Sequence, residues 1–258
     1  MHENYLGFGK DVSGQLLFED ATQLVTSGRF FDLNEALLHL WELYLEFWRA
    51  RGKPSNDPVF TQNTLCWSSH ADFPTLVQKI KGANSKRILI WALHRCVDVA
   101  RADGASEVQK DMACMAHHLS SYIELCDTCG LFFTEGQAQE AQNHGSKFLL
   151  WWQYFAHTAV GEQRCAHKLR PKLHYFAHTV KELTDCRENP AKKALWGAED
   201  LVGQVKKIGK HCSKRTVNKR VAQRRALGVA MRAKFRGWRG KTAQQPTRAQ
   251  KTSLFVIS

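Results

Sequence analysis

The stretch DLNEALLHLWELYLEFWRARGKP, residues Asp32–Pro54, indicates the fold class most clearly. Asp32 is followed three residues later by Glu35, which is the spacing of a helix capping box. Large apolar side chains then recur at helical spacing, at Leu33, Leu37, Leu40, Trp41, Tyr44, Phe47 and Trp48. Gly52 and Pro54 end the pattern. This stretch therefore predicts an amphipathic helix with one face in a protein core.

Similar patterns extend in both directions along the chain. They predict further helices over 14–27, 74–81, from Asn84 or Ser85 past Cys96, and over 107–126, 137–158, 171–184, 199–212 and 213–235. Sustained alternation of apolar and polar residues, the signal of a strand, is rare. We expect an all-α fold, an irregular bundle of about eight helices with a basic C-terminal helical extension.

The composition fits a packed protein, because 43% of the 258 residues are hydrophobic. Met1–Asn4 has neither the basic start nor the apolar run of a secretory signal. The longest apolar runs, such as Ile88–Leu93, fall far short of the roughly 20 residues that span a bilayer. We expect an intracellular protein with no membrane partner, for which the nucleus is a compatible compartment. Its eight cysteines are then expected to be reduced thiols.

Charge divides the chain into parts of different character. Of the 37 Lys and Arg residues, 16 lie from Leu201 to Ser258, where there is no Asp or Glu. The first 200 residues carry the other 21 basic residues and all 24 acidic ones, a formal charge of −3. We predict a helical body over 1–198, a basic helical region over 199–236 and a flexible tail over 237–258. This asymmetry favours a polyanionic partner.

The basic region predicts two amphipathic helices with cationic outer faces. Leu201, Val205, Ile208 and Cys212 share a face of the first, and Val217, Val221, Leu227, Met231 and Phe235 form a stripe on the second. The candidate phosphate-binding residues are Lys206, Lys207, Lys210, Lys214, Arg215, Lys219, Arg220, Arg224, Arg225, Arg232 and Lys234. DNA or RNA is the expected partner. An acidic protein, a nuclear-import tract and a basic surface without a specific partner are the alternatives.

The pentapeptide YFAHT occurs twice, at Tyr154–Thr158 and at Tyr175–Thr179. The flanking residues do not match, so we interpret the two copies as helices with the same core pattern rather than as a duplicated module. In the second copy, His174 and His178 are four residues apart and share a helix face. A metal there needs a third ligand, for which His167, Cys165 and Cys186 are near in sequence. We expect instead partly buried histidines with hydrogen-bond partners.

Cys126 and Cys129 form a C-x-x-C pair at the end of a predicted helix, with His117 and His118 upstream. A structural zinc site normally has a second close pair, and the chain has no second C-x-x-C. We therefore expect no bound metal and no cofactor, with the pairs His174–His178 and Cys126–Cys129 as the alternative metal ligands. The sequence also lacks a dinucleotide fingerprint, a phosphate-binding P-loop and a G-x-S-x-G nucleophile motif.

Arg170–His178, with its pattern P-K-x-H-x-x-x-H, resembles a segment near the C-terminal part of cut-and-paste transposases of the hAT-like and Kyakuja–Dileera–Zisupton or Plavaka-like groups. In these proteins an acid-led helix follows, to which Trp196–Asp200 is similar, and Phe73–Ala83 is similar to a further helical stretch. The resemblance implies that Glu199 matches the last acid of a metal site in an RNase-H-like fold. That fold needs a mixed sheet with two earlier aspartates, which the sequence does not indicate.

We therefore predict a non-catalytic, mobile-element-derived helical protein whose basic region binds nucleic acid. One alternative is a metal-dependent transposase or nuclease that uses Glu199 with Asp200 or the histidines. Another is a helical scaffold that docks onto an acidic protein.

Overall fold

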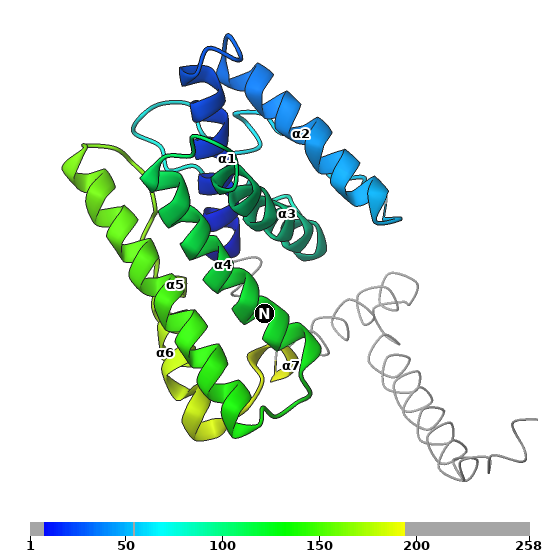
Figure 1. Cartoon of the computed structure of the whole chain (residues 1–258), viewed down its shortest axis with the longest axis vertical. Coiled ribbons are helices and arrows are strands. Elements are labelled where there is room, and N and C mark those ends of the chain that lie inside the picture. Colours follow the sequence, from blue (N-terminus) through cyan, green and yellow to red (C-terminus); the bar gives the residue numbers. More distant parts are fainter. Residues whose placement is uncertain (1–7, 54, 194–258) are drawn as a thin grey trace, which may run out of the picture. The chain divides into compact units, whose positions relative to one another are not determined.

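The architecture was obtained as a computed structural model, which describes residues 8–53 and 55–193. This part of the chain folds into six long helices and one short one, without a β-strand. The helices are α1 (Gly9–Thr26), α2 (Leu33–Ala50), α3 (Gly82–Ala100), α4 (Glu107–Thr128), α5 (Glu135–Gly161), α6 (Pro171–Cys186) and α7 (Pro190–Lys193) (Figure 1). The predicted all-α class is confirmed for these residues.

The predicted cap of α2 forms with a small change in its pattern. The Asp32 carboxylate accepts the backbone N–H of Glu35 at 2.9 Å, as expected of an N-cap. The Glu35 carboxylate, however, reaches back to the N–H of Phe31 at 3.1 Å rather than to that of Asp32. At the other end Gly52 has a φ of +67°, a conformation that favours glycine, and α2 ends before it as predicted.

The helices pack largely in the order of the chain. α1 contacts α2 and α3, and α3 contacts α4. α4 and α5 form a long antiparallel hairpin, and α6 returns along α5 (Figure 1). Short connections favour such antiparallel neighbours. Ser106 starts α4 and Thr134 starts α5, each with a complete capping box.

Aromatic side chains fill two parts of the core. Tyr44 of α2 lies with its ring centroid 5.3 Å from that of Phe60 and 5.5 Å from that of Trp91 of α3. Near the other end of the chain, Phe176 of α6 lies 4.6 Å from Phe8 and 5.1 Å from Tyr122 of α4 by the same measure. These side chains join elements that are distant in sequence, so the described residues share one continuous core.

The predicted helix over 74–81 is wrong, because residues 73–77 take no regular secondary structure. The backbone N–H groups of residues 75–77 donate instead to remote carbonyl groups. The N–H of residue 75 donates to Leu65, that of residue 76 to Lys10 and that of residue 77 to Thr64, at 2.9 to 3.1 Å. Long-range hydrogen bonds thus replace those of a helix and hold this segment against α1.

Gly14 allows this crossing. A Cβ atom built on Gly14 would lie 2.5 Å from the Cα of Thr75 and 2.7 Å from its backbone nitrogen. The segment can approach α1 so closely only because this position has no side chain. α1 begins at Gly9 rather than at Gly14, so the crossing lies well inside the helix.

Other helix limits differ less from prediction, and α3 begins at Gly82 rather than after Asn84 or Ser85. The helices predicted over 199–212 and 213–235, and the boundaries of the basic region and tail, lie outside the described residues. The predicted count of about eight helices therefore stays a prediction. Across the described residues, none of the helices combines the length and the apolar character needed to cross a membrane.

Candidate functional site

The residues predicted to bind nucleic acid, from Lys206 to Lys234, lie outside the described part of the chain, as does Glu199. Their roles stay predictions. The histidines and cysteines considered as metal ligands, from His117 to Cys186, lie within the described residues, together with a histidine cluster that the motifs did not single out.

His174 and His178 share one face of α6, as their spacing predicts. Their Nε2 atoms are 2.9 Å apart, and the ring planes are almost perpendicular. Both side chains are exposed, so the expectation of partial burial was wrong. Within the described residues, no third His, Cys, Asp or Glu joins them in a geometry suited to a metal ion. The two rings therefore lie on one helix face and are joined by a hydrogen bond between their Nε2 atoms.

His167, considered as a third ligand, is directed into the core instead. Its side chain is 3% exposed and lies against the rings of Phe155 and Trp152, with centroids 5.1 and 4.9 Å away. Neither ring nitrogen has a hydrogen-bond partner among the described residues. Burial, with the nearby charge of Arg164, lowers the pKa of His167 to about 3. The ring is therefore held neutral, and it is a packing element rather than a ligand.

Cys126 and Cys129 end α4 and are part of a structural junction. Cys126 is buried, and burial raises the pKa of its thiol to about 12, so the reactive thiolate is disfavoured. The buried side chain of Asn189 donates from Nδ2 to the carbonyl oxygens of Cys126, Cys129 and Gly130, at 2.9, 3.3 and 2.9 Å. The C-x-x-C loop is thus held by an amide that satisfies the last carbonyls of a helix. Among residues 8–53 and 55–193, no further His, Cys, Asp or Glu joins this pair in a geometry suited to a metal ion.

Arg170–His178, the segment predicted to resemble transposases, links α6 to α1 through Arg170. Pro171 is the first residue of α6, a position for which its fixed φ is suited. Arg170 precedes it, and its Nε atom lies 3.2 Å from the buried carboxylate of Asp11 in α1. Burial raises the pKa of Asp11, while a hydrogen bond from Thr75 and the charge of Arg170 oppose that rise. In the described residues this motif therefore has a packing role.

Both YFAHT copies bury their phenylalanine and expose their histidine. Phe155 and Phe176 are core residues, whereas Tyr154 and Tyr175 are 52% and 58% exposed, and His157 and His178 are also exposed. The two pentapeptides lie on α5 and α6, which pack against each other. The same residue pattern thus provides the same kind of buried face on two helices.

A cavity of about 280 Å³ lies between α1, α3 and the start of α4. Its walls include Leu16 and Trp91, and an ion pair between Asp20 and Arg95, at 2.9 Å, borders it. Cys96 is the thiol in its wall, and burial raises the pKa of this group to about 12. The carboxylate and the guanidinium are bound to each other, and the thiol stays protonated. The cavity therefore presents no activated nucleophile.

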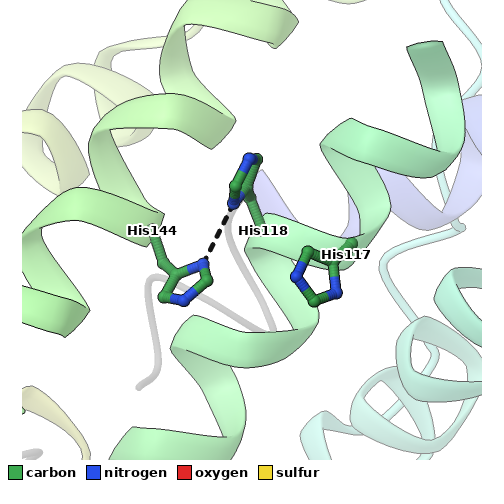
Figure 2. A group of neighbouring side chains, drawn as sticks. All are labelled: His117, His118 and His144. Atoms are coloured by element: carbon green, nitrogen blue, oxygen red, sulfur yellow. Dashed lines mark hydrogen bonds between the residues drawn. The ribbon is translucent and has the colours of Figure 1, made fainter.

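Three histidines from two helices meet on the surface of the α4–α5 hairpin. His117 and His118 belong to α4 and His144 to α5, and Figure 2 shows their rings gathered across the gap between the helices. Each ring offers a nitrogen such that the three atoms all lie within 4.8 Å of one another. The Nδ1 atoms of His118 and His144 are 3.0 Å apart. This is the one group of three or more potential metal ligands within the described residues.

No protein-family model, curated protein or solved structure shows a significant match to this chain. The resemblance of Arg170–His178 to transposases therefore stays a prediction.

The sequence carried a signal for the histidine cluster that the motif analysis missed. His118 lies 13 residues before Leu131 and His144 lies 13 residues after it, and Leu131 is in the connection between α4 and α5. In an antiparallel hairpin, residues equally distant from the turn lie at the same level. The two helices were predicted separately, so this symmetry could have indicated the pairing.

Proposed function

We propose that this protein is a non-catalytic, nucleic-acid-binding helical protein that contacts phosphates through its basic region, residues 199–236. One observation carries the proposal: 16 Lys and Arg residues and no Asp or Glu lie between Leu201 and Ser258. The rest of the chain has a formal charge of −3, so the positive charge is concentrated at one end of the sequence.

Electrostatics explains why such a segment favours a polyanion. Exposed helices usually carry both signs of charge, because opposite charges three or four residues apart attract and like charges repel. The basic region has no carboxylate of its own after Asp200 to offset that repulsion. A nucleic-acid backbone supplies phosphates along its length, and binding releases the counterions that surround it. Contacts of this kind do not read base sequence, so we propose binding without strong sequence preference.

The helical body is proposed to be a carrier of this region rather than an enzyme. A transposase-type phosphoryl-transfer site needs carboxylates placed on a sheet to hold two metal ions. Residues 8–53 and 55–193 contain no strand. The described residues therefore offer no sheet on which such carboxylates could be placed, and we propose that Glu199 is not part of a catalytic site.

Fluorescence anisotropy with a labelled DNA duplex and a labelled RNA of equal length tests the proposal. We expect the full chain to bind both, and to bind more weakly at the higher of two salt concentrations. Deletion of residues 201–258 should abolish binding, while circular dichroism and thermal unfolding show that the remaining body is folded.

Four outcomes would contradict the proposal. Absence of binding by the full chain, or binding that salt does not weaken, would exclude phosphate contacts as its basis. Capture of an acidic protein that persists after nuclease treatment, without nucleic-acid binding, would favour the scaffold alternative. Cleavage of the duplex with Mg²⁺, lost in Glu199→Gln, would establish an enzyme.

A further inference from the structure

His117, His118 and His144 bring imidazoles from two helices to one point on the hairpin. The ring centroids of His118 and His144 are 5.2 Å apart (Figure 2). The ring centroid of His117 lies 5.5 Å from that of His118 and 5.8 Å from that of His144. His117 and His118 are adjacent on α4, and His144 faces them from α5. Since α4 and α5 pack along their lengths, the hairpin itself holds the three rings together.

The nitrogen positions are close to those of a metal site. Two imidazole nitrogens bound to one tetrahedral Zn²⁺, each about 2.0–2.1 Å from the ion, are about 3.4 Å apart. The Nδ1 atoms of His118 and His144 are 3.0 Å apart without an ion. One nitrogen of His117 lies within 4.8 Å of one nitrogen of each of the other two rings, and the His117 side chain is exposed.

Burial lowers the pKa of two of the three rings, His118 and His144. A histidine binds a metal only when it is deprotonated. Burial, and then the neighbouring His144, His117 and Lys147, lower the pKa of His118 to about 4. Burial also lowers the pKa of His144, and Glu140 opposes this change.

We propose that His117, His118 and His144 bind one Zn²⁺ ion and thereby link α4 to α5. Imidazole nitrogen suits zinc among the divalent metals, and three histidines are an established ligand set for it. No fourth His, Cys, Asp or Glu in the described residues completes the group, so solvent takes the fourth position. Because His117 is exposed, the ion exchanges with solution. This site is independent of the nucleic-acid-binding proposal, since all three ligands lie in the helical body.

The competing explanation is a hydrogen bond between two neutral rings. One of the two Nδ1 atoms, in His118 or His144, would carry the hydrogen and the other would accept it. This explanation accounts for the pair but gives His117 no part, so the contribution of His117 distinguishes the two.

The test is a zinc titration of the full chain, stripped of metal and kept reduced with a phosphine, in competition with a chromophoric chelator. We expect one equivalent to bind. His118→Gln and His144→Gln should each weaken binding by at least about 100-fold, since loss of a partner outside the ligand shell already costs 10- to 100-fold. His117→Gln, at an exposed position, should also weaken it. The matched control is the exposed pair on α6, for which His174→Gln with His178→Gln should leave the affinity unchanged.

Co²⁺ in place of Zn²⁺ gives a readout that does not depend on the variants folding. The wild-type chain should show the visible absorption of tetrahedral Co²⁺ without the near-ultraviolet band of thiolate ligands. Zinc should also raise the melting temperature of the wild type but not of His118→Gln. The proposal is overturned if the wild type binds no stoichiometric zinc, if the thiolate band appears, if binding survives in His118→Gln and His144→Gln, or if His117→Gln binds as tightly as the wild type.

Discussion

His167 is a histidine that the fold keeps neutral, with both ring nitrogens buried among aromatic side chains. Its pKa in the folded protein is lowered to about 3, against about 6.5 in an unfolded chain. As the pH falls below about 6.5, the unfolded chain takes up a proton that the folded protein refuses. His167 therefore stabilises the fold fully above that pH, and its contribution is lost progressively down to about pH 3.

We predict that His167→Phe makes the free energy of unfolding less dependent on pH in this window. The difference in slope should be on the order of 1.4 kcal/mol per pH unit. His167 has a φ of +51°, so phenylalanine adds backbone strain and lowers the absolute stability, whereas the slope reports the titration alone. Urea unfolding at several pH values measures it. His157→Gln, at an exposed position of α5, should keep the wild-type slope, and an unchanged slope in His167→Phe would refute the assignment.

Asn189 holds the end of α4 through hydrogen bonds that only an amide can donate. Asn189→Asp keeps the size and the oxygen that accepts the N–H of Ala191, but it places a carboxylate against three carbonyl oxygens. We predict a loss of about 3 kcal/mol in the free energy of unfolding, because buried acceptors lose their donor and a charge is buried. Denaturant unfolding measures the change, with Asn63→Asp at an exposed position as the control. Equal stability of the two variants would show that the amide does not hold this junction.

At the scale of elements, Gly14 is the helix glycine in the described residues that another backbone segment approaches most closely, where residues 73–77 cross α1. We predict that Gly14→Ala destabilises the protein by about 1–3 kcal/mol or more, because the added methyl group meets the backbone of Thr75 rather than a flexible side chain. Gly136→Ala in α5 is the matched control, since a Cβ there meets nothing within 4 Å. The control should keep or slightly raise the stability. Thermal unfolding of both variants measures the difference in stability. If Gly14→Ala were as stable as the wild type, the 73–77 segment would be able to move away from α1, contrary to the prediction.

The helices that the sequence predicted well are those with a strong local pattern. The N-cap of α2, its apolar face and the residues that end it all lie within one stretch of sequence. Its first and last residues could therefore be predicted from local sequence alone. The 73–77 segment was missed because its hydrogen-bond partners are at Lys10, Thr64 and Leu65, and a local window contains no sign of them. Propensity is a weak guide wherever tertiary contacts supply the backbone bonds.

The candidate sites show the same division between local and remote information. The i,i+4 spacing of His174 and His178 predicted correctly that the two side chains share a helix face, because one helix determines that geometry. The meeting of His118 and His144 depends on how α4 packs against α5, and their packing was not part of the prediction. The burial of His167 likewise depends on Phe155 and Trp152 from another element. The sequence therefore predicted the arrangement of side chains on one helix, but it did not predict the arrangements that depend on the packing of two elements.

At the scale of the whole molecule, the basic residues are concentrated in one segment of the sequence, and the packing of a hydrophobic core does not explain that concentration. A near-neutral helical body with its own core precedes a segment with 16 basic residues and no acidic ones. Packing accounts for the body, but it gives no reason for excluding carboxylates from the segment. A polyanionic partner gives such a reason, and it makes the strength of binding depend on salt.

The direct test of this account is the slope of the logarithm of the DNA-binding constant against the logarithm of salt concentration. With about five neutralised phosphates, we predict a slope of roughly −4 to −5 for the full chain. Changing Lys206, Lys207, Lys210 and Lys214 to Gln should make the slope shallower by about 0.9 for each phosphate that is no longer neutralised. The same change at four exposed cations of the body, Arg49, Lys53, Lys79 and Lys81, should leave the slope as it is. A slope near zero, or an equal effect of the two sets of substitutions, would contradict the account.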